Sequence, residues 1–424
     1  MAVEGWEEVK LKDIAEYRRG SFPQPYGLPK WYDEENGYPF VQVFDIDKNL
    51  RLKPQTKNKI SEEAAQQSVF IGKGTLIVSI QGSIGRIAIT QYDAYVDRTV
   101  LLFKRFLKPL NKIFFANALQ CLFEIEKVRA PGGTIKTITK EVLSDFSINL
   151  PPLPEQKKIA EILGSVDDAI AKTEAVIAQT ERVKQGLLQQ LLTCGIGHTK
   201  FKQTEIGEIP ESWEYIPLGN IIAELRAGVS VNSENRMKAT NESGILKTSA
   251  VTYGCFLPQE HKTILEHELE RAKVNPKQNS IIFSRMNTPT LVGASVYIEK
   301  DYPDLFLPDR LWLFVPQDCK EFNMHWLSYL LGAPFMRDII SGIATGTSGS
   351  MKNISKKKLL NLHIPLPNNE EQKRIVKKLY CIDNMIFKIE NKLKKLQILK
   401  SGLMSDLLTG RMRVNATKTD EVAA

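Results

Sequence analysis

The residues Leu150-Pro-Pro-Leu-Pro-Glu-Gln156 are followed by a run that contains no proline as far as Leu192. Prolines stop the preceding strand because they lack the N–H that a sheet requires, so a new element begins after them. Apolar residues then recur at alternating steps of four and three, a 3.5-residue period that predicts a coiled-coil helix. The predicted seam consists of Ile159, Leu163, Val166, Ile170, Thr173, Ile177, Thr180, Lys184, Leu187 and Leu191.

The same segment occurs twice in the chain. Lys136 and Lys352 differ by 216 positions, and so do Glu155 and Glu371, so the register is constant through both segments. A repeat of this length indicates two copies of one structural unit. The second predicted seam consists of Ile375, Leu379, Ile382, Ile386, Ile389, Leu393, Leu396, Lys400, Leu403 and Leu407.

Lys184 and Lys400 interrupt the two seams at the same point. A polar residue inside an apolar seam usually fixes the register of the helices. An amphipathic helix packed on its own domain is the alternative, but about 38 residues is long for such a helix. We therefore expect the seams to pair as an antiparallel coiled coil roughly 57 Å long, with the globular parts at its opposite ends.

The regions ahead of the two helices match more loosely. Trp6 corresponds to Trp213 and Asp97-Arg98 to Asp309-Arg310, at different shifts, so the loops differ in length. β-rich runs followed by a helical stretch predict a mixed α/β (α+β) domain in each copy. The expected strands are 75–80, 86–90 and 96–103 in the first copy and 280–284, 294–298 and 311–315 in the second, with helices at 112–128 and 323–340.

These patterns divide the chain into six parts. The internal repeat sets the domain boundaries, because each variable segment is followed by a near-constant one. We expect a first variable domain at 1–150, a helical spacer at 151–197, a linker at 198–209, a second variable domain at 210–365, a second spacer at 366–413 and a flexible tail at 414–424.

Composition excludes several protein classes. No apolar run approaches the ~18 residues of a membrane span, and the start lacks a secretory signal, so we expect a cytoplasmic protein. The five cysteines are odd in number and far apart, which argues against a disulfide framework or a zinc site. The 57 Lys and Arg exceed the 49 Asp and Glu, and the excess is concentrated in residues 347–413, with 15 basic and 5 acidic residues.

No catalytic motif is present. The chain lacks both a GxxxxGK[ST] loop and a GxGxxG turn between a strand and a helix. His261 and His267 fit a solvated helix face, and Asp301 and Asp304 have no third acid at a suitable spacing for a metal. We therefore expect no catalytic, metal or cofactor site.

Candidate DNA contacts are easier to identify. Arg, Asn and Gln can read base edges through paired hydrogen bonds, although an ordinary surface role is an equally good explanation for any one of them. Small residues beside a lysine suit a phosphate contact or a plain structural turn. The candidates are Arg18, Arg19, Gln81, Ser83, Arg86, Thr134 and Lys136 in the first copy, and Arg226, Lys247, Ser249, Arg285, Asn287, Ser350 and Lys352 in the second.

The whole pattern resembles the specificity subunit of type I restriction-modification systems. The most specific motifs are Leu150-Pro-Pro-Leu-Pro-Glu-Gln156, Leu366-Pro-Asn-Asn-Glu-Glu-Gln372 and Leu407-Leu-Thr-Gly-Arg411, together with the lead from Phe201 to Trp213. The chain departs from the pattern at Cys194-Gly195, where the second copy has Gly410-Arg411.

This resemblance implies a function without catalysis. Each variable domain would read one half of a split sequence in double-stranded DNA, and the helices would set the spacer and dock two methyltransferase subunits. S-adenosylmethionine, ATP and Mg²⁺ would act only on the methyltransferase and restriction/translocase subunits. Two different readers on one rod also predict an asymmetric site, whereas identical readers in a homodimer would favour a palindrome.

Two other functions compete with this one. A stand-alone DNA-binding coiled-coil scaffold or regulator would use the same rod without modification partners. A fused methyltransferase is disfavoured because the chain has neither a cofactor loop nor an Asn-Pro-Pro-aromatic motif.

Overall fold

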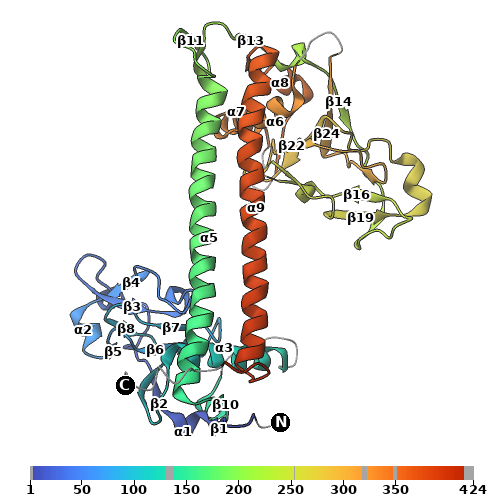
Figure 1. The fold of residues 1–424 in the computed structure, drawn as a ribbon. Coiled ribbons are helices and arrows are strands. Elements are labelled where there is room, and N and C mark those ends of the chain that lie inside the picture. The colour runs from blue at the N-terminus through green and yellow to red at the C-terminus, as the bar shows by residue number, and fades with distance from the viewer. Residues whose placement is uncertain (1–2, 130–137, 253, 318–321, 347–350, 415–424) are drawn as a thin grey trace. The chain divides into compact units, whose positions relative to one another are not determined.

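The computed structural model describes residues 3–129, 138–252, 254–317, 322–346 and 351–414. Two compact units are present: the first comprises Met1–Ala175 with Glu390–Ala424, and the second comprises Val176–Ile389. Two long helices, α5 (Leu153–Thr193) and α9 (Asn369–Leu407), each contribute to both units (Figure 1). Helix α5 begins before Pro154 rather than after it, because proline is tolerated in the first turn of a helix.

The first unit contains two four-stranded sheets. One has the strand order β2-β9-β6-β7 and the other β4-β3-β8-β5, and β1 pairs with β10 to join the start of the domain to its end. The bounds are β1 Glu7–Lys10, α1 Leu11–Ile14, β2 Ala15–Arg19, β3 Tyr38–Val41, β4 Asn58–Ile60, α2 Glu62–Ala65, β5 Val69–Ile71, β6 Leu76–Ser79, β7 Ile87–Ile89, β8 Ala94–Val96, β9 Val100–Phe106, α3 Lys112–Arg129, α4 Lys140–Ser144 and β10 Ser147–Leu150.

The core of the first unit has two layers. Strand β9 alternates between them: Leu101 and Phe103 pack towards α3, whereas Val100 and Leu102 face the second sheet. This alternation follows from the two-residue period of a strand. The layer on the α3 side also contains residues from both long helices, Ile159 and Leu163 of α5 and Leu407 of α9, so the domain and the helix pair share one core.

The second unit repeats this plan with different loops. Its sheets have the orders β14-β24-β20-β22 and β15-β19-β16-β23, and β13 pairs with β26 as β1 does with β10. The bounds are β11 Phe201–Thr204, β12 Gly207–Pro210, β13 Glu214–Pro217, β14 Ile222–Ala227, β15 Ser233–Glu234, β16 Gly244–Leu246, β17 Val251–Thr252, β18 Cys255–Phe256, β19 His261–Ile264, β20 Ser280–Ser284, β21 Met286–Asn287, β22 Ser295–Ile298, β23 Leu305–Phe306, β24 Leu311–Pro316, α6 Met324–Gly332, α7 Pro334–Gly342, β25 Lys352–Asn353, α8 Lys356–Leu360 and β26 His363–Leu366.

Two segments of the second unit differ from expectation. The expected helix at 323–340 is two helices, because Pro334 forces Ala333 into an extended conformation and ends α6. The expected linker contains a hairpin, β11 paired with β12, whose turn at Glu205 and Ile206 leads into Gly207, which has a φ of 105°. The mixed α/β fold with two domain copies and two long helices is confirmed.

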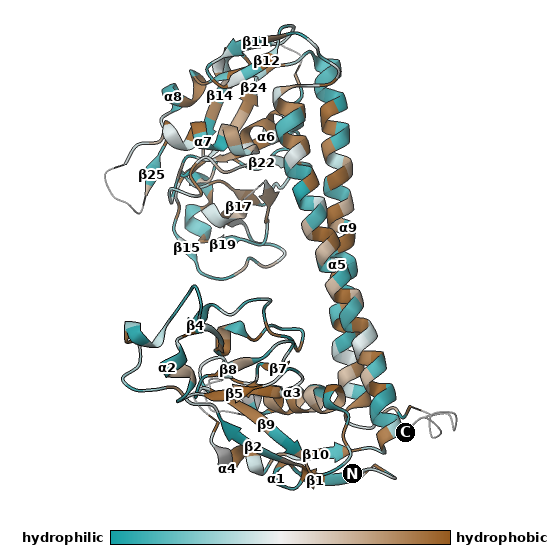
Figure 2. Cartoon of the chain, turned by 90° about the vertical axis from the view of Figure 1, so that its left-hand side faces the viewer, coloured by the Kyte–Doolittle hydropathy of each residue, from teal (hydrophilic) through white to brown (hydrophobic). Residues whose placement is uncertain are grey.

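The long helices are antiparallel within each unit. In the first unit Asp167 of α5 lies 2.7 Å from Lys400 of α9, and in the second unit Lys184 of α5 lies 2.5 Å from Asp383 of α9. All predicted seam positions are buried or half-buried. Figure 2 shows polar and apolar patches alternating along both helices. Among the described residues, no helix is long and apolar enough to cross a membrane.

Candidate nucleic-acid interface

In the first domain, two groups of predicted DNA contacts lie at the same end of one sheet. Arg18 and Arg19 end β2, and the loop from Gln81 to Arg86 follows β6. Both strands pair with β9, with Arg19 and Val78 each opposite Leu101. The ends of β2 and β6 therefore lie on either side of β9, and these residues lie at the same end of the sheet.

The loop after β6 is held by the side chain of Ser79, the last residue of that strand. The Ser79 hydroxyl donates to the Ser83 carbonyl at 2.6 Å and accepts from the Arg86 N–H at 2.9 Å. The Arg86 guanidinium donates to the Ile46 carbonyl at 3.3 Å. Gln81 and Ser83 are exposed. The ordered loop thus leaves Gln81 and Ser83 available, and Arg86 is exposed too, with its guanidinium anchored to the Ile46 carbonyl.

In the second domain the corresponding arginines have acidic partners. Arg226 of β14 lies 2.8 Å from Glu224 on the same strand. Arg285 follows β20, where its guanidinium lies 3.5 Å from the Asp309 carboxylate and also donates to the Asp309 carbonyl at 2.7 Å and to Asn353 Oδ1 at 3.1 Å. These contacts hold Arg285 in one orientation at the sheet end.

Two predicted contacts of the second domain, 65 positions apart in sequence, lie on paired strands. Asn287 of β21 is opposite Lys352 of β25 in an antiparallel pair, and both are half-buried. The Asn287 side chain donates to Ser284 Oγ at 3.3 Å. The turn that contains Arg285 and strand β25, which contains Lys352, therefore form one surface.

The remaining predicted contacts lie elsewhere. Lys247 precedes and Ser249 lies within a short helical turn, Thr248–Ala250, after β16 in the other sheet. Both contact Glu260, at 3.7 and 2.8 Å. Thr134, Lys136 and Ser350 lie outside the described residues.

One buried glutamate joins each domain to the helix pair. The sequence suggested no role for either residue. Glu371, 1% exposed, accepts from Trp213 Nε1 at 2.9 Å and from the Ile196 N–H at 2.9 Å, and it contacts His198 at 2.8 Å. Its repeat equivalent in the first copy is Glu155. The only sequence signal for either residue is that Glu-Gln-Lys occurs identically in both copies.

Glu155 has a comparable set of donors. Trp6 Nε1 donates to it at 3.1 Å, and the Arg413 guanidinium donates through two nitrogens at 2.9 Å. Burial alone would raise the pKa of Glu155, but the hydrogen bonds from Arg413 and Trp6 outweigh it and lower the pKa below its ordinary value. Glu155 therefore stays ionised at neutral pH and holds the segment after α9 against the start of the first domain.

The described part of the chain contains no group of three or more His, Cys, Asp or Glu side chains arranged to hold a metal ion. The side chains that gather at the sheet ends are hydrogen-bond donors and cations. Such an arrangement is suited to contact with phosphates and base edges.

Comparisons with known proteins agree with this geometry. A family model described as the type I restriction modification DNA specificity domain matches residues 3–182 and again residues 210–398. The MjaVIII type I restriction enzyme specificity subunit of Methanocaldococcus jannaschii is 26% identical over 420 residues, covering 97% of this chain and 94% of that protein. The EcoBI specificity subunit of Escherichia coli is 23% identical over 430 residues, covering 96% and 86%.

Two solved structures share the fold. The S subunit of a type I restriction-modification system from M. genitalium gives a TM-score of 0.57 at 14% identity and covers 96% of this chain and 99% of that one. A chain from work on complex assembly and conformational transition of the type I R-M system gives a TM-score of 0.58 at 17% identity, covering 96% and 98%. Because the family model matches both copies of the repeat, this chain belongs to the type I restriction-modification DNA specificity family.

Proposed function

We propose that this chain recognises a split, asymmetric DNA site, with residues 1–150 reading one half and residues 210–365 the other. The observation that carries the proposal is the repeated sheet, β2-β9-β6-β7 and β14-β24-β20-β22, with different side chains at the same end of each. One scaffold with two different sets of contacts suits two different half-sites.

The helices provide surface for protein partners. In the second unit, Tyr380, Met385 and Phe387 of α9 are 42%, 53% and 61% exposed. In the first unit, Ile398 and Leu399 of the same helix are 72% and 50% exposed. Large apolar side chains exposed along a helix are typical of an interface with another protein. The partners we propose are methyltransferase subunits, with restriction subunits joining the same complex.

In this proposal the chain itself is not an enzyme. Methyl transfer would use S-adenosylmethionine on the methyltransferase subunits, and cleavage would use ATP and Mg²⁺ on the restriction subunits. The support for this division is the sequence, which contains neither a nucleotide-binding loop nor a methyltransferase motif.

A domain exchange tests the reading of half-sites. Residues 210–365 are replaced by the corresponding domain of a relative, and methylated positions are mapped in DNA from cells that carry the complete system. We expect one half of the methylated sequence to change and the other half to remain. A change in both halves, or in neither, would contradict the proposal.

A substitution on α9 tests partner docking. Phe387→Ser should reduce the amount of methyltransferase subunit that copurifies with the chain, because it removes an exposed apolar contact. Lys388→Ser, at the exposed neighbouring position, is the matched control. If the chain with its native sequence copurifies with no methyltransferase subunit, a stand-alone DNA-binding scaffold is the better description.

A further inference from the structure

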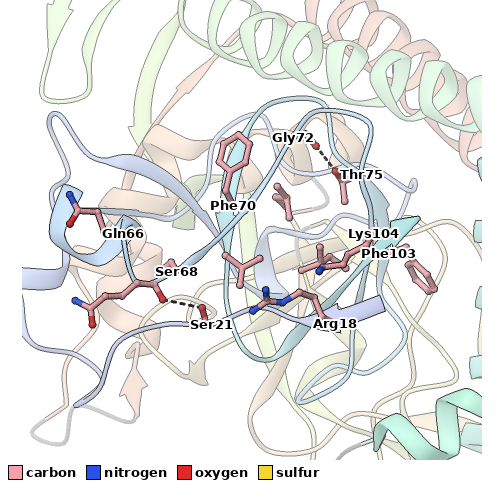
Figure 3. A pocket seen from close by; sticks show the side chains of 13 residues that line it. Arg18, Ser21, Gln66, Ser68, Phe70, Gly72, Thr75, Phe103 and Lys104 are labelled. Carbon is pink, nitrogen blue, oxygen red and sulfur yellow. Dashed lines mark hydrogen bonds between the residues drawn. The ribbon is translucent and has the colours of Figure 1, made fainter. Parts of the chain in front are cut away.

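An open pocket of about 570 Å³ lies in the first domain between two edge strands (Figure 3). Strand β2 is at the edge of one sheet and β5 at the edge of the other. The pocket is lined by Arg18, Leu102, Phe103 and Lys104 from β2 and β9, and by residues of the segment from Gln66 to Thr75 together with Ser21. Only one of these residues, Arg18, was predicted to contact DNA.

The pocket is positively charged. Arg18 and Lys104 are both exposed, and no Asp or Glu is among the lining residues. Within the described ranges, neither cation forms an ion pair with a carboxylate. The next residue, Arg105, is different, because its guanidinium lies 2.6 Å from Glu16. Arg18 and Lys104 therefore carry charge that no carboxylate in the described part of the chain neutralises.

Lys104 lies at a β-bulge beside the pocket. Glu16 is opposite Arg105 and Tyr17 is opposite Phe103, so Lys104 is the extra residue of β9 and has no partner on β2. Bulges redirect a side chain from the regular alternation of a strand. In the second domain the irregularity lies instead between Ile222 and Glu224, on β14. The strand irregularity beside the pocket is thus particular to the first domain.

The other side of the pocket offers polar and apolar contacts. Ser68 Oγ is buried and has no hydrogen-bond partner in the described structure. Ser21 Oγ donates to the Gln67 carbonyl at 3.1 Å, which fixes the loop beside it. The ring of Phe70 is 55% exposed although it belongs to a strand. The exposed ring of Phe70 beside the cations Arg18 and Lys104 suits a ligand that is anionic with an apolar part, whereas the buried Ser68 hydroxyl does not face the open pocket.

We propose that this pocket binds one phosphodiester of duplex DNA, with Arg18 and Lys104 neutralising the phosphate and Phe70 packing on the adjoining sugar. The proposal rests on the proposed function, because it assigns a backbone contact to the DNA that the first domain reads. Such a contact positions the duplex but does not select its sequence. It therefore predicts an effect that is independent of the recognised bases.

The salt dependence of DNA binding tests this proposal. The full chain is titrated with two unrelated 30-base-pair duplexes at several salt concentrations, and log Kd is plotted against log salt. For the variant carrying Arg18→Gln and Lys104→Gln, we expect the magnitude of the slope to fall by about 1, equally for both duplexes. Arg105→Gln, at a cation already paired with Glu16, should leave the slope unchanged.

The outcomes separate this proposal from the proposed function. Failure of the native chain and its complex to bind any duplex would contradict the function itself. Native binding with the same slope in the double variant and in Arg105→Gln would overturn the phosphate contact alone. An unchanged DNA slope with lost binding of inorganic phosphate would also overturn it, because the pocket would then take a free anion. If the double variant does not fold, the same slope is measured for Lys104→Gln alone, because this change affects only one exposed side chain.

Discussion

Glu371 shows how a single side chain attaches a recognition domain to a helix. Its carboxylate accepts from Trp213 at the start of the second domain and from Ile196, just after α5. The end of α5, the start of the second domain and the start of α9 therefore meet at one buried carboxyl group. A buried carboxylate is stable only when donors replace the water it has lost, so the donors and the acid depend on one another.

Removal of the Glu371 carboxylate should destabilise the second unit. Glu371→Ala leaves the Trp213 and Ile196 N–H groups buried and unpaired, which we expect to cost about 3 kcal/mol and to lower Tm by several degrees. Thermal unfolding monitored by circular dichroism measures the change. Glu370→Ala alters the neighbouring glutamate, which is exposed and paired with Lys373, and should shift Tm little. Equal shifts in the two variants would contradict a specific role for Glu371.

Glu155 should make the first unit sensitive to acid. Its pKa lies below the ordinary value of 4.5 in the folded chain, because the Arg413 and Trp6 hydrogen bonds outweigh the effect of burial. The stabilisation is therefore complete above about pH 4.5 and is lost as the pH falls through the lower folded pKa. The difference in Tm between the native chain and Glu155→Gln should be largest at neutral pH and shrink below pH 4.5. Glu8→Gln, at an exposed carboxyl, should give no such trend.

At the scale of elements, two reciprocal ion pairs fix the register of the long helices. Lys184 pairs with Asp383 and Lys400 with Asp167, and each pair is the repeat equivalent of the other. In both pairs the residue numbers sum to 567, so one antiparallel register satisfies both. A slipped register would leave the lysines in the seam without these partners, at a cost in free energy.

A charge exchange tests this role at the more buried pair. Lys400 and Asp167 side chains are 15% and 18% exposed. Lys400→Asp should destabilise the first unit by about 2 kcal/mol, because it places two carboxylates together, and the added change Asp167→Lys should restore most of the loss. Lys395→Asp, at an exposed position, is the control. Urea unfolding measures the effect, and no recovery in the double variant would contradict pairing.

The same exchange at the other pair should recover less. Tyr329 of α6 donates its hydroxyl to Asp383 at 2.5 Å, and Asp383→Lys removes that acceptor. Even with Lys184→Asp in place, the Tyr329 hydroxyl would lose its partner. Comparison of the two exchanges by urea unfolding therefore separates the helix ion pair from the contact with the second domain. Equal recovery at both pairs would contradict this role of Tyr329.

The sequence predicted the long helices better than the contacts between them. Steps of three and four residues identify the seam and its lysines directly. The partner acids Asp167 and Asp383 each follow a seam residue and look like ordinary surface positions until the helices pair. The bulge at Lys104 has no local sequence signal, because it depends on the register between β2 and β9. Contacts that arise from tertiary pairing are the part that periodicity cannot provide.

At the scale of the whole molecule, the repeat gives each unit parts of both long helices. The first unit combines the start of α5 with the end of α9, and the second combines the end of α5 with the start of α9. Each recognition domain is therefore anchored to both helices by its own core and its own buried glutamate. A change in the length of one helix must therefore be matched in the other if both domains are to keep their contacts with both helices.

Shortening both helices by one heptad should shorten the DNA spacer. Residues 171–177 of α5 lie opposite residues 390–396 of α9, because the numbers of paired residues sum to 567. Deletion of both stretches retains both lysine–aspartate pairs. At 1.5 Å per residue the deletion removes about 10 Å, which corresponds to at most about 3 base pairs at 3.4 Å each. Methylation mapping in cells with the complete system should show the same two half-sites with a shorter gap. Deletion of only residues 171–177 breaks the register and should abolish methylation. Recovery of the original gap after the paired deletion would show that the helices do not set the spacer.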